Sequence, residues 1–400
     1  MNELPKKARA VIIGGGVIGC SVAYHLGKLG WKDVILLERK QLTSGTTWHA
    51  AGLIAQLRAS KNMTRLAKYS RELYSKLEAE TGIATGLKQN GSITVALTEE
   101  RKEEILRQAS MARAFDVEVE EISPAEVKAR YEYLNIDGVK GAVWLPLDGQ
   151  GDPGNIALAM AKGARQFGVQ IRERVAVTHI PVKGRRAVGV DWQDETGASG
   201  RIEADMVVNC GGMWGHQIGR MAGVNVPLQA CEHFYVVTEN IPDLPQLPVL
   251  RVPDECAYFK EDAGKFLLGA FEPVAKPWGM KGIPQNFEFD QLPEDFDHFE
   301  PILSDAVNRM PVLAEAGIHT FFNGPESFTP DDAYHLGLAP ELDNFWVAAG
   351  FNSIGIQSAG GAGMALVQWI EDGAKPFDLG DVDIARMQPF QGNRHYLFER

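Results

Sequence analysis

A glycine-rich turn near the N-terminus constrains the fold of this chain more than any other feature. The apolar run RAVII, residues 9–13, leads into Gly14, Gly16 and Gly19, which have GxGxxG spacing, and a helical pattern follows. The run DVILLER, residues 33–39, reads as a second buried parallel strand. In such a unit the first glycine makes a tight turn, the second lets a pyrophosphate approach the backbone, and the third lets the helix pack on the sheet. The sequence therefore predicts a βαβ unit that binds a dinucleotide.

Glu38 closes the second strand and narrows the choice of dinucleotide. It follows the glycines by roughly the 20 residues at which an acidic side chain accepts hydrogen bonds from ribose hydroxyls. A carboxylate there repels a 2′-phosphate, so NADP is the poorest fit, but the motif does not separate NAD from FAD. Arg39 and, in the loop that follows, Thr46 and Thr47 are assigned to the same site.

A second glycine-rich junction between a strand and a helix, GFNSIGIQSAGGAGMAL, lies at residues 350–366. One junction at each end of the chain suits a long cofactor held at two places, which favours FAD over NAD. The N-terminus of the second helix is expected to stabilise negative charge on a reduced flavin. The alternative is close packing of a helix on a strand, which glycine also serves. The cofactor residues predicted from this junction and from a strand-like run at 169–180 are Gly350, Asn352, Gly355, Ile356 and Val175.

The order of elements predicts an α/β fold with an inserted α+β lobe. Helices and parallel strands lie at both ends of the chain, and residues 231–271 look like antiparallel sheet. A Rossmann-like FAD-binding lobe then carries a substrate lobe built on a mainly antiparallel sheet. Residues 273–300 read as a loop, and the last helix is expected to run from Ser358 to Glu371. We predict that the FAD-binding lobe comprises residues 1–90, 149–229 and 324–390, and the substrate lobe residues 91–148 and 230–323.

Composition excludes several classes of protein. A net charge of −12 argues against a nucleic-acid surface, which needs clustered basic residues. No apolar run approaches the roughly 20 residues that span a bilayer, so no membrane segment is expected. The four cysteines have no CxxC spacing, so no metal site is indicated and a reducing compartment is favoured. We expect a cytoplasmic protein, with a mature mitochondrial matrix form as the alternative.

Several motifs together resemble a known family. The pattern GGGxxG…LLER…LTSGTTWHAAGL…QNGS…VNCGGMWG…YVVTE…GPESFTPD…GFNSIG resembles the FAD domain of sarcosine and dimethylglycine dehydrogenases, which are D-amino-acid-oxidase-like flavoproteins. The resemblance runs from about Arg9 to the C-terminus. It implies FAD-dependent oxidative N-demethylation of a secondary or tertiary N-methyl amino acid such as sarcosine or dimethylglycine. The flavin takes a hydride equivalent from the N-methyl carbon, and the iminium is hydrolysed to formaldehyde and the demethylated amine.

The resemblance gives a role to His49, which lies in SGTTWHAAGL. In this family the matching histidine is joined covalently to the 8α-methyl carbon of the flavin. The small neighbours Gly45, Ala50, Ala51 and Gly52 allow a flavin edge to approach closely. Without the family, a histidine with a satisfied hydrogen bond is the simpler interpretation.

The resemblance also places His233 and Tyr258 on strands that face the flavin, and both are predicted to be catalytic. Their alternatives are a histidine that hydrogen-bonds within its strand and a core tyrosine with a solvated hydroxyl. An amino-acid carboxylate is best held by an arginine, which can bind it through two hydrogen bonds. Arg58 is the first candidate for this role and Arg251 the second, whereas Arg309 is interpreted as structural.

Two departures from the family matter. Relatives continue into a folate-binding half, whereas this sequence stops at Arg400. The chain is therefore expected to be a stand-alone dehydrogenase, a subunit with a folate-binding partner, or an excised domain. Tyr334 and His335 replace a more usual proline-containing pattern and are expected to reshape the substrate wall.

The acceptor of the electrons and two other functions stay open. Oxygen or an electron-transfer flavoprotein accepts the electrons, and no motif separates the two. The alternatives to the demethylating enzyme are a non-catalytic regulatory flavoprotein subunit and an NAD-linked amino-acid dehydrogenase.

Overall fold

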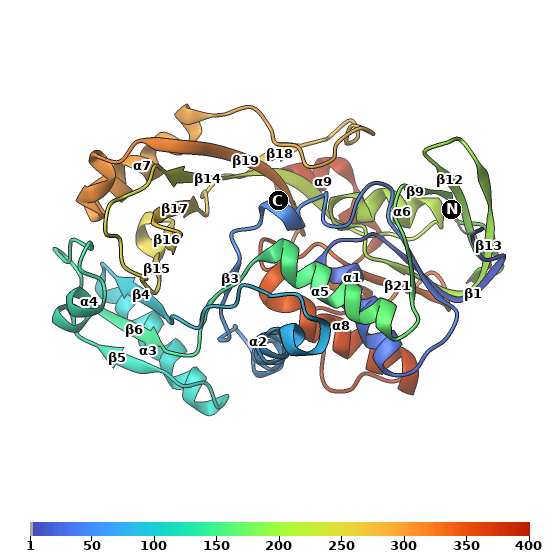
Figure 1. The fold of residues 1–400 in the computed structure, drawn as a ribbon, viewed down its shortest axis with the longest axis horizontal. Helices are drawn as coiled ribbons and strands as arrows, with labels where there is room; N and C mark the ends of the chain where they lie inside the picture. The colour runs from blue at the N-terminus through green and yellow to red at the C-terminus, as the bar shows by residue number, and fades with distance from the viewer. Residues whose placement is uncertain (1–2) are drawn as a thin grey trace.

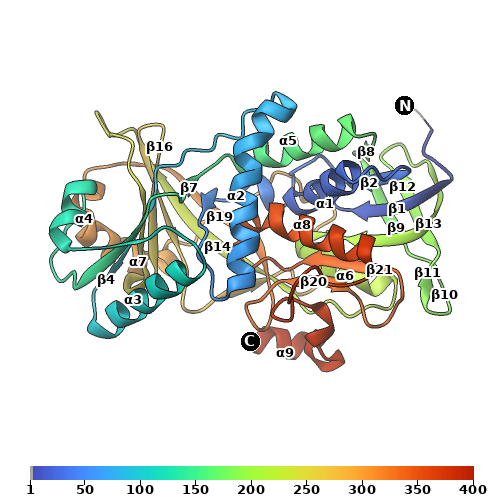
Figure 2. The same ribbon diagram turned by 90° about the horizontal axis from the view of Figure 1, so that it is seen from below.

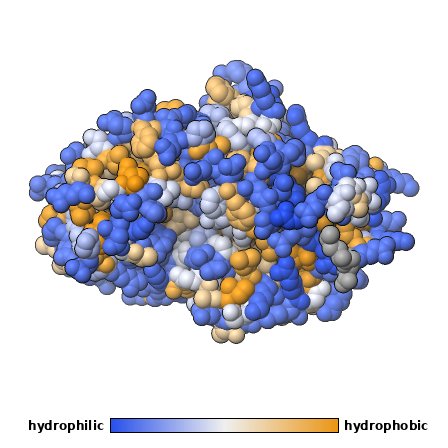
Figure 3. Space-filling view, turned by 45° about the horizontal axis from the view of Figure 1, so that its top comes forward, coloured by the Kyte–Doolittle hydropathy of each residue, from blue (hydrophilic) through white to orange (hydrophobic). Residues whose placement is uncertain are grey.

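Two large sheets organise the protein. The computed structural model describes residues 3–400, with an eight-stranded sheet and a nine-stranded sheet in adjoining lobes (Figure 1). Helix α2 (Lys61–Thr81) lies between the two lobes in the view of Figure 2. One face of the molecule is covered mainly by hydrophilic residues, with hydrophobic ones in small scattered groups (Figure 3).

The eight-stranded sheet is built on a parallel centre. Strand β1 pairs in parallel with β2 and β13, and β13 pairs in parallel with β21, while β20 joins the edge in antiparallel fashion. The order is β20-β21-β13-β1-β2-β8, with β12 and β9 attached through β13. The strands are β1 (Lys7–Ile13), β2 (Val34–Leu37), β8 (Gln170–Arg172), β9 (Val175–His179), β12 (Gly189–Asp194), β13 (Ser199–Asn209), β20 (His335–Leu338) and β21 (Phe345–Ala349).

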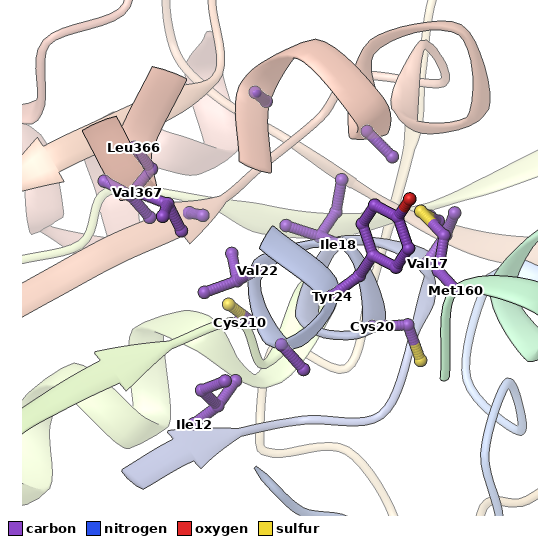
Figure 4. Close-up of a cluster of buried hydrophobic side chains, with 14 of the residues drawn as sticks. Ile12, Val17, Ile18, Cys20, Val22, Tyr24, Met160, Cys210, Leu366 and Val367 are labelled. Carbon is purple, nitrogen blue, oxygen red and sulfur yellow. The ribbon is translucent and has the colours of Figure 1, made fainter. Parts of the chain in front are cut away.

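Helix α1 (Val17–Lys28) forms the core of this lobe. Every residue from Val17 to Gly27 is buried. This burial agrees with the sequence of the segment, which is mostly apolar on all sides rather than amphipathic. It packs against α5 (Pro153–Gln166) and α8 (Gly355–Asp372), and its side chains meet Ile12 of β1, Met160 of α5 and Leu366 of α8 (Figure 4). The short helix α6 (Gly215–Met221) follows β13.

The nine-stranded sheet is mainly antiparallel. Its order is β18-β14-β17-β16-β15-β4-β6-β5, β19 also pairs with β14, and only β15 and β4 run parallel. Helices α3 (Glu99–Ala114), α4 (Pro124–Arg130) and α7 (Phe296–Arg309) belong to this lobe. The strands are β4 (Ser92–Ala96), β5 (Glu120–Ile122), β6 (Gly141–Leu145), β14 (Gln229–Thr238), β15 (Val249–Val252), β16 (Ala257–Asp262), β17 (Lys265–Ala270), β18 (Lys276–Trp278) and β19 (Ile318–Phe328).

Small elements complete the chain. The described residues also contain a β3–β7 pair, a β10–β11 hairpin and a C-terminal helix α9. None of the helices from residue 3 onwards is both long and apolar enough to cross a membrane. The bounds are β3 (Leu53–Ile54), β7 (Gly149–Gln150), β10 (Val182–Lys183), β11 (Arg186–Ala187) and α9 (Arg394–Glu399).

The fold class predicted from the sequence is confirmed, and two details are corrected. The segment 273–300 is not wholly loop, because it contains β18 and the start of α7. Helix α8 begins at Gly355 rather than Ser358. The sequence did not mark this start, because the N-cap residue, Ile354, has no side chain that can cap a helix. The predicted lobe boundaries stay a proposal. Strand β19 crosses the predicted boundary between residues 323 and 324.

Glycines let α8 contact two other helices. A Cβ atom on Gly361 would lie 2.2 Å from the carbonyl oxygen of Leu66 in α2, and one on Gly363 would lie 2.2 Å from the Ser21 hydroxyl in α1. These glycines of the second junction therefore serve close packing, of helix on helix rather than helix on strand.

We expect the substitution Gly361→Ala to destabilise the protein by about 1–3 kcal/mol, because the backbones of α2 and α8 must separate to admit the methyl group. Gly154→Ala in α5 is the matched control. A Cβ there meets only the Asp152 carboxylate at 3.4 Å, so better helix propensity should leave stability equal or higher. Urea unfolding of both variants measures the difference, and equal midpoints would contradict the packing argument.

Candidate active site

A long cavity lies where the predicted dinucleotide motif ends. This dinucleotide cavity contains roughly 1440 Å³ of empty space, part of it open to solvent. Of the residues predicted for the cofactor, only Gly19 is absent from its wall. The others line it: Gly14, Gly16, Glu38, Arg39, Thr46, Thr47, Val175, Gly350, Asn352, Gly355 and Ile356.

The glycines of the first turn have the geometry that the motif predicts. Gly14 has φ +111°, and a Cβ on it would lie 2.4 Å from the carbonyl oxygen of Cys210. A Cβ on Gly19 would lie 1.9 Å from the carbonyl oxygen of Gly14. Gly19 therefore brings α1 against the turn and is absent from the wall for that reason. Gly16 lies on the wall, and its approach to a pyrophosphate stays a prediction.

Glu38 is held by the turn that it faces. The carboxylate is buried and accepts hydrogen bonds from the backbone N–H of Gly15 at 2.7 Å and of Lys40 at 2.8 Å. Burial raises the pKa of Glu38, although these two N–H groups oppose the shift. The side chain is thus fixed at the end of β2, on the wall of the cavity.

Arg39 closes one side of the cavity. Its guanidinium donates to the carbonyl oxygens of Gln285 at 2.9 Å and Phe287 at 2.5 Å, and it lies 4.1 Å from the centre of the Trp214 ring. Gln285 is itself part of the wall. Arg39 therefore anchors a segment of the other lobe beside the cavity.

The second junction approaches the same cavity from the opposite end of the chain. Asn352 has φ +47°, a left-handed conformation that asparagine tolerates, and its side-chain oxygen accepts the N–H of Thr329 at 2.7 Å. Neither α1 nor α8 has a side-chain N-cap. Both helix N-termini border the cavity, so they offer partial positive charge at two places. A long dinucleotide that carries a pyrophosphate and an electron-accepting ring fits this pair of sites.

A smaller inner cavity adjoins the first. It contains roughly 540 Å³ of empty space and shares Ala50, Glu326, Ser353 and Ile356 with the dinucleotide cavity. Its remaining wall is His49, Ala51, Gly52, Leu53, His233, Tyr235, Arg251, Tyr258, Phe271 and Gln357. It therefore contains three of the residues predicted for covalent attachment and catalysis, namely His49, His233 and Tyr258.

One face of the nine-stranded sheet supplies part of this wall. Arg251 of β15 pairs with Tyr258 of β16, Tyr258 pairs with Gly269 of β17, and Gly269 pairs with Tyr235 of β14. A Cβ on Gly269 would lie 2.0 Å from the Tyr258 ring, so glycine lets this ring lie across β17. His233 lies two residues before Tyr235 and shares its face.

His49 is buried at the junction of the cavities. Its ring lies 5.1 Å from that of Phe322, and a Cβ on Gly324 would lie 2.6 Å from its Nδ1 atom. The Nε2 atom is buried and has no hydrogen-bond partner among residues 3–400. Burial, with a smaller contribution from His233, lowers the pKa of His49 to about 3. The structure therefore does not show the satisfied hydrogen bond of the simpler interpretation.

His233 lies near two carboxylates, those of Glu272 and Glu326. Its Nδ1 atom is 3.2 Å from Oε2 of Glu272, and its Nε2 atom is 3.4 Å from the Ser353 hydroxyl. Burial lowers the pKa of His233, but the hydrogen bond with Glu272 and the charges of Glu326 and Glu272 outweigh it, so the pKa is raised. Burial also raises the pKa of Glu326.

The structure distinguishes the two arginines that are candidates for binding the substrate carboxylate. Arg251 is on the wall of the inner cavity. Neither its guanidinium nor that of Arg58 makes an ion pair or hydrogen bond with the described residues, so the cavity wall alone distinguishes them. Burial lowers the pKa of Arg251, against the charge of Asp148. Arg58 lines neither cavity, and burial together with Arg251 lowers its pKa to about 10. Arg309 is paired with Glu255 at 2.6 Å, as its structural interpretation requires.

Tyr334 and His335 do not reshape the substrate wall, which corrects the expectation from the sequence. Both are fully buried and line neither cavity. Tyr334 stacks on Phe351 with ring centres 4.3 Å apart, and Nε2 of His335 lies 2.6 Å from the carbonyl oxygen of Pro227.

Sequence reasoning missed several residues of the inner cavity. Tyr235 had a usable signal, because it alternates with His233 along a strand. Glu326 likewise alternates with Gly324 in β19. Ser353 lies in a loop, where no periodicity points to a cavity, and so does Glu272, which contacts His233 but does not line the cavity. In residues 3–400, no group of three or more histidine, cysteine, aspartate or glutamate side chains is placed to hold a metal ion.

A two-lobed fold, in which a dinucleotide cavity bordered by glycines adjoins a small cavity with polar residues, is typical of flavin-dependent oxidoreductases. The family described as FAD dependent oxidoreductase matches residues 9–369. The chain belongs to this family.

Known relatives share nearly the whole chain. It is 41% identical over 400 residues to 4-methylaminobutanoate oxidase (formaldehyde-forming) of Paenarthrobacter nicotinovorans, covering 100% of this chain and 48% of that protein. It is 40% identical to mitochondrial sarcosine dehydrogenase of Mus musculus, covering 96% and 42%. It is also 38% identical to the mouse pyruvate dehydrogenase phosphatase regulatory subunit, covering 99% and 45%. The chain thus spans less than half the length of these relatives.

A solved structure has the same fold. L-proline dehydrogenase from P. horikoshii superposes with a TM-score of 0.83 at 26% identity, covering 93% of this chain and 96% of the other.

We expect stability to fall as the pH drops below about 6.5, because buried histidines stay neutral in the folded state. Burial lowers the pKa of His25 and His335 to about 4, so below 6.5 the unfolded chain binds protons that the folded chain does not. At pH 5 each such histidine costs about 2 kcal/mol. Urea unfolding at pH 7 and pH 5 measures the loss, and His25→Gln should reduce it by about that amount. An unchanged loss in this variant would contradict the assignment.

Proposed function

We propose that this chain catalyses FAD-dependent oxidative N-demethylation of a secondary or tertiary N-methyl amino acid. The observation that carries the proposal is the inner cavity, which joins the dinucleotide cavity beside His49 and has an unpaired arginine, Arg251, on its wall. The relatives that oxidise 4-methylaminobutanoate and sarcosine support it.

The residues of the dinucleotide cavity fit FAD. We infer that Glu38 accepts hydrogen bonds from ribose hydroxyls and that the N-terminus of α1 binds the pyrophosphate. The N-terminus of α8 then stabilises negative charge on the ring system. When bound, FAD supplies the site that accepts a hydride equivalent from the N-methyl carbon.

His49 is the proposed point of covalent attachment. Its Nε2 atom is buried and unpaired and the ring is neutral, so in the Nδ1–H tautomer the Nε2 lone pair is available. A bond from Nε2 to the 8α carbon replaces one C–H bond of the methyl group. The bond would release two electrons and a proton, which the flavin would take up when bound and pass on to the electron acceptor of turnover, oxygen or an electron-transfer flavoprotein.

The inner cavity orients the substrate by charge. Arg251 binds the carboxylate, and Tyr258 lies beside it with a hydroxyl that can donate. The amine lies toward His233, whose Nε2 atom accepts the proton that an ammonium group must lose before it is oxidised. The iminium product is hydrolysed to formaldehyde and the demethylated amine. Transfer of the one-carbon unit to folate would require a folate-binding partner.

A non-catalytic role is the second candidate, because one relative is a regulatory subunit. Membership of an FAD-dependent family disfavours the NAD-linked alternative. We propose a cytoplasmic or mitochondrial matrix location for the mature protein.

A denaturing gel tests the covalent bond. We expect the wild-type band to fluoresce as flavin under ultraviolet light, and the His49→Ala band to lose this signal because Nε2 is gone. His319→Ala, at an exposed histidine, is the control and should keep it. If wild-type protein fully loaded with flavin gives a dark band, the attachment is not formed.

An anaerobic substrate panel tests catalysis. We expect sarcosine, dimethylglycine or 4-methylaminobutanoate to bleach the visible flavin absorbance, and methylamine, which lacks a carboxylate, not to do so. Arg251→Gln should lower kcat/KM by about 100-fold through loss of a charged hydrogen bond worth about 3 kcal/mol, and Arg58→Gln by less than about 10-fold. If none of these amines bleaches the wild-type flavin, the regulatory role is favoured instead. A larger effect at Arg58 would restore it as the carboxylate ligand.

A further inference from the structure

A buried carboxylate behind His233 has no place in the function described so far. Glu272 follows β17, and its side chain is only 7% exposed although Phe271 beside it is 44% exposed. Its Oε2 atom lies 3.2 Å from Nδ1 of His233, and its Oε1 atom accepts the backbone N–H of Phe234 at 3.2 Å. The two carboxylate oxygens therefore contact two successive residues of β14, one each.

This contact determines which nitrogen of His233 carries a proton. An ionised carboxylate only accepts hydrogen bonds, so the proton between Glu272 and the ring lies on Nδ1. In a neutral imidazole the other nitrogen is then an acceptor. That atom, Nε2, is 3.4 Å from Ser353, a residue of the cavity wall. The lone pair of His233 is thereby located on the side of the cavity.

We propose that Glu272 is a positioning residue, which fixes the Nδ1–H tautomer of His233 and so makes Nε2 the acceptor of the substrate's ammonium proton. The proposal rests on the function proposed above. In this step one N–H bond of the ammonium breaks and the Nε2–H bond forms. No electrons are exchanged, and the resulting imidazolium is stabilised by Glu272.

The surroundings of His233 allow this transfer. The ionisable groups that face it are Glu272 from the loop after β17, Glu326 from β19, His49 from the loop after β2, and Tyr258 from β16. The two carboxylates favour the protonated ring, while neutral His49 adds no charge. Removal of the Glu272 charge must therefore lower the pKa of His233.

A simpler role for Glu272 would be to anchor its loop. Phe271 contacts the rings of His233 and Tyr258 at 5.5 and 5.6 Å between centres, so a displaced loop would also disturb the cavity. The two roles differ in their effect on His233, because an anchor alone does not change which nitrogen is protonated. The test must therefore observe the imidazole itself.

The first measurement is ¹⁵N NMR of histidine-labelled holoenzyme, with the His233→Asn variant to assign the signal. We expect wild-type His233 to be the Nδ1–H tautomer when neutral. Glu272→Gln should lower its pKa and abolish the tautomer preference, and Glu272→Asp should restore part of both. Glu239→Gln is the matched control, since Glu239 lies 3.4 Å from Nδ1 of the exposed His319 and should affect only that residue.

The second measurement is the pH dependence of kcat/KM, which should rise with pH as His233 loses its proton. Glu272→Gln should move this rise to lower pH and reduce the plateau by about 10–100-fold, as is usual when a group that orients a functional histidine is removed. A reduced plateau with the rise unmoved and the tautomer retained would overturn the proposal and leave Glu272 as an anchor.

The two proposals fail in different ways. The NMR titration needs no turnover, so it tests Glu272 even if no amine reduces the flavin. Failure of the demethylase function appears as a wild-type flavin that no N-methyl amine bleaches. Failure of this inference appears as a His233 titration that Glu272→Gln leaves unchanged.

Discussion

The close approach of α1 to the end of β1 is the constraint on which the dinucleotide cavity depends. At Gly14 and Gly19 the backbones are so near that a methyl group would lie well within van der Waals contact distance of a carbonyl oxygen. This contact directs the N-terminus of α1, where the Val17 N–H donates to the Thr47 hydroxyl, at the cavity. It also leaves Glu38 to complete the turn through its bond to the Gly15 amide. Because the turn also touches Cys210 at the end of β13, strands far apart in sequence become its support.

Two glycines of the nine-stranded sheet make room for rings of the inner cavity. Gly324 leaves room for the His49 ring, and Gly269 leaves room for the Tyr258 ring, so a loop of one sheet and a face of the other can meet around one small volume. A side chain at either position would displace a group of the inner cavity. The cavity is thus defined as much by glycines on the nine-stranded sheet as by its polar residues, and glycines within strands carry meaning of this kind.

Local sequence could predict the turn and the fold class, because GxGxxG imposes a geometry that few other turns share. All but one of the cofactor residues that it named lie on the wall of the dinucleotide cavity. Sequence reasoning ranked Arg58 above Arg251, whereas the structure puts Arg251 on the cavity wall, since the pairing of β15 with β16 brings Arg251 beside Tyr258. It also misjudged Tyr334 and His335, whose departure from the family pattern suggested a reshaped wall although both are packed in the core. Glu272 was beyond reach for a related reason, because its partner is 39 residues away and its own loop has no periodicity.

The charges of the inner cavity argue for a zwitterionic ligand. Arg251 lies on the wall without a direct ion pair, and the buried carboxyl group of Asp148 acts on it only through its charge. Glu326 and the Glu272–His233 pair lie several strands further across the sheet. Burial of unpaired charge costs several kcal/mol unless a ligand compensates it. A cation and a separate acidic group within one small volume are compensated together only by a molecule that carries a carboxylate at one end and an amine at the other. A site used only to hold the fold would gain stability by replacing these groups with apolar ones, so their presence favours a working substrate site.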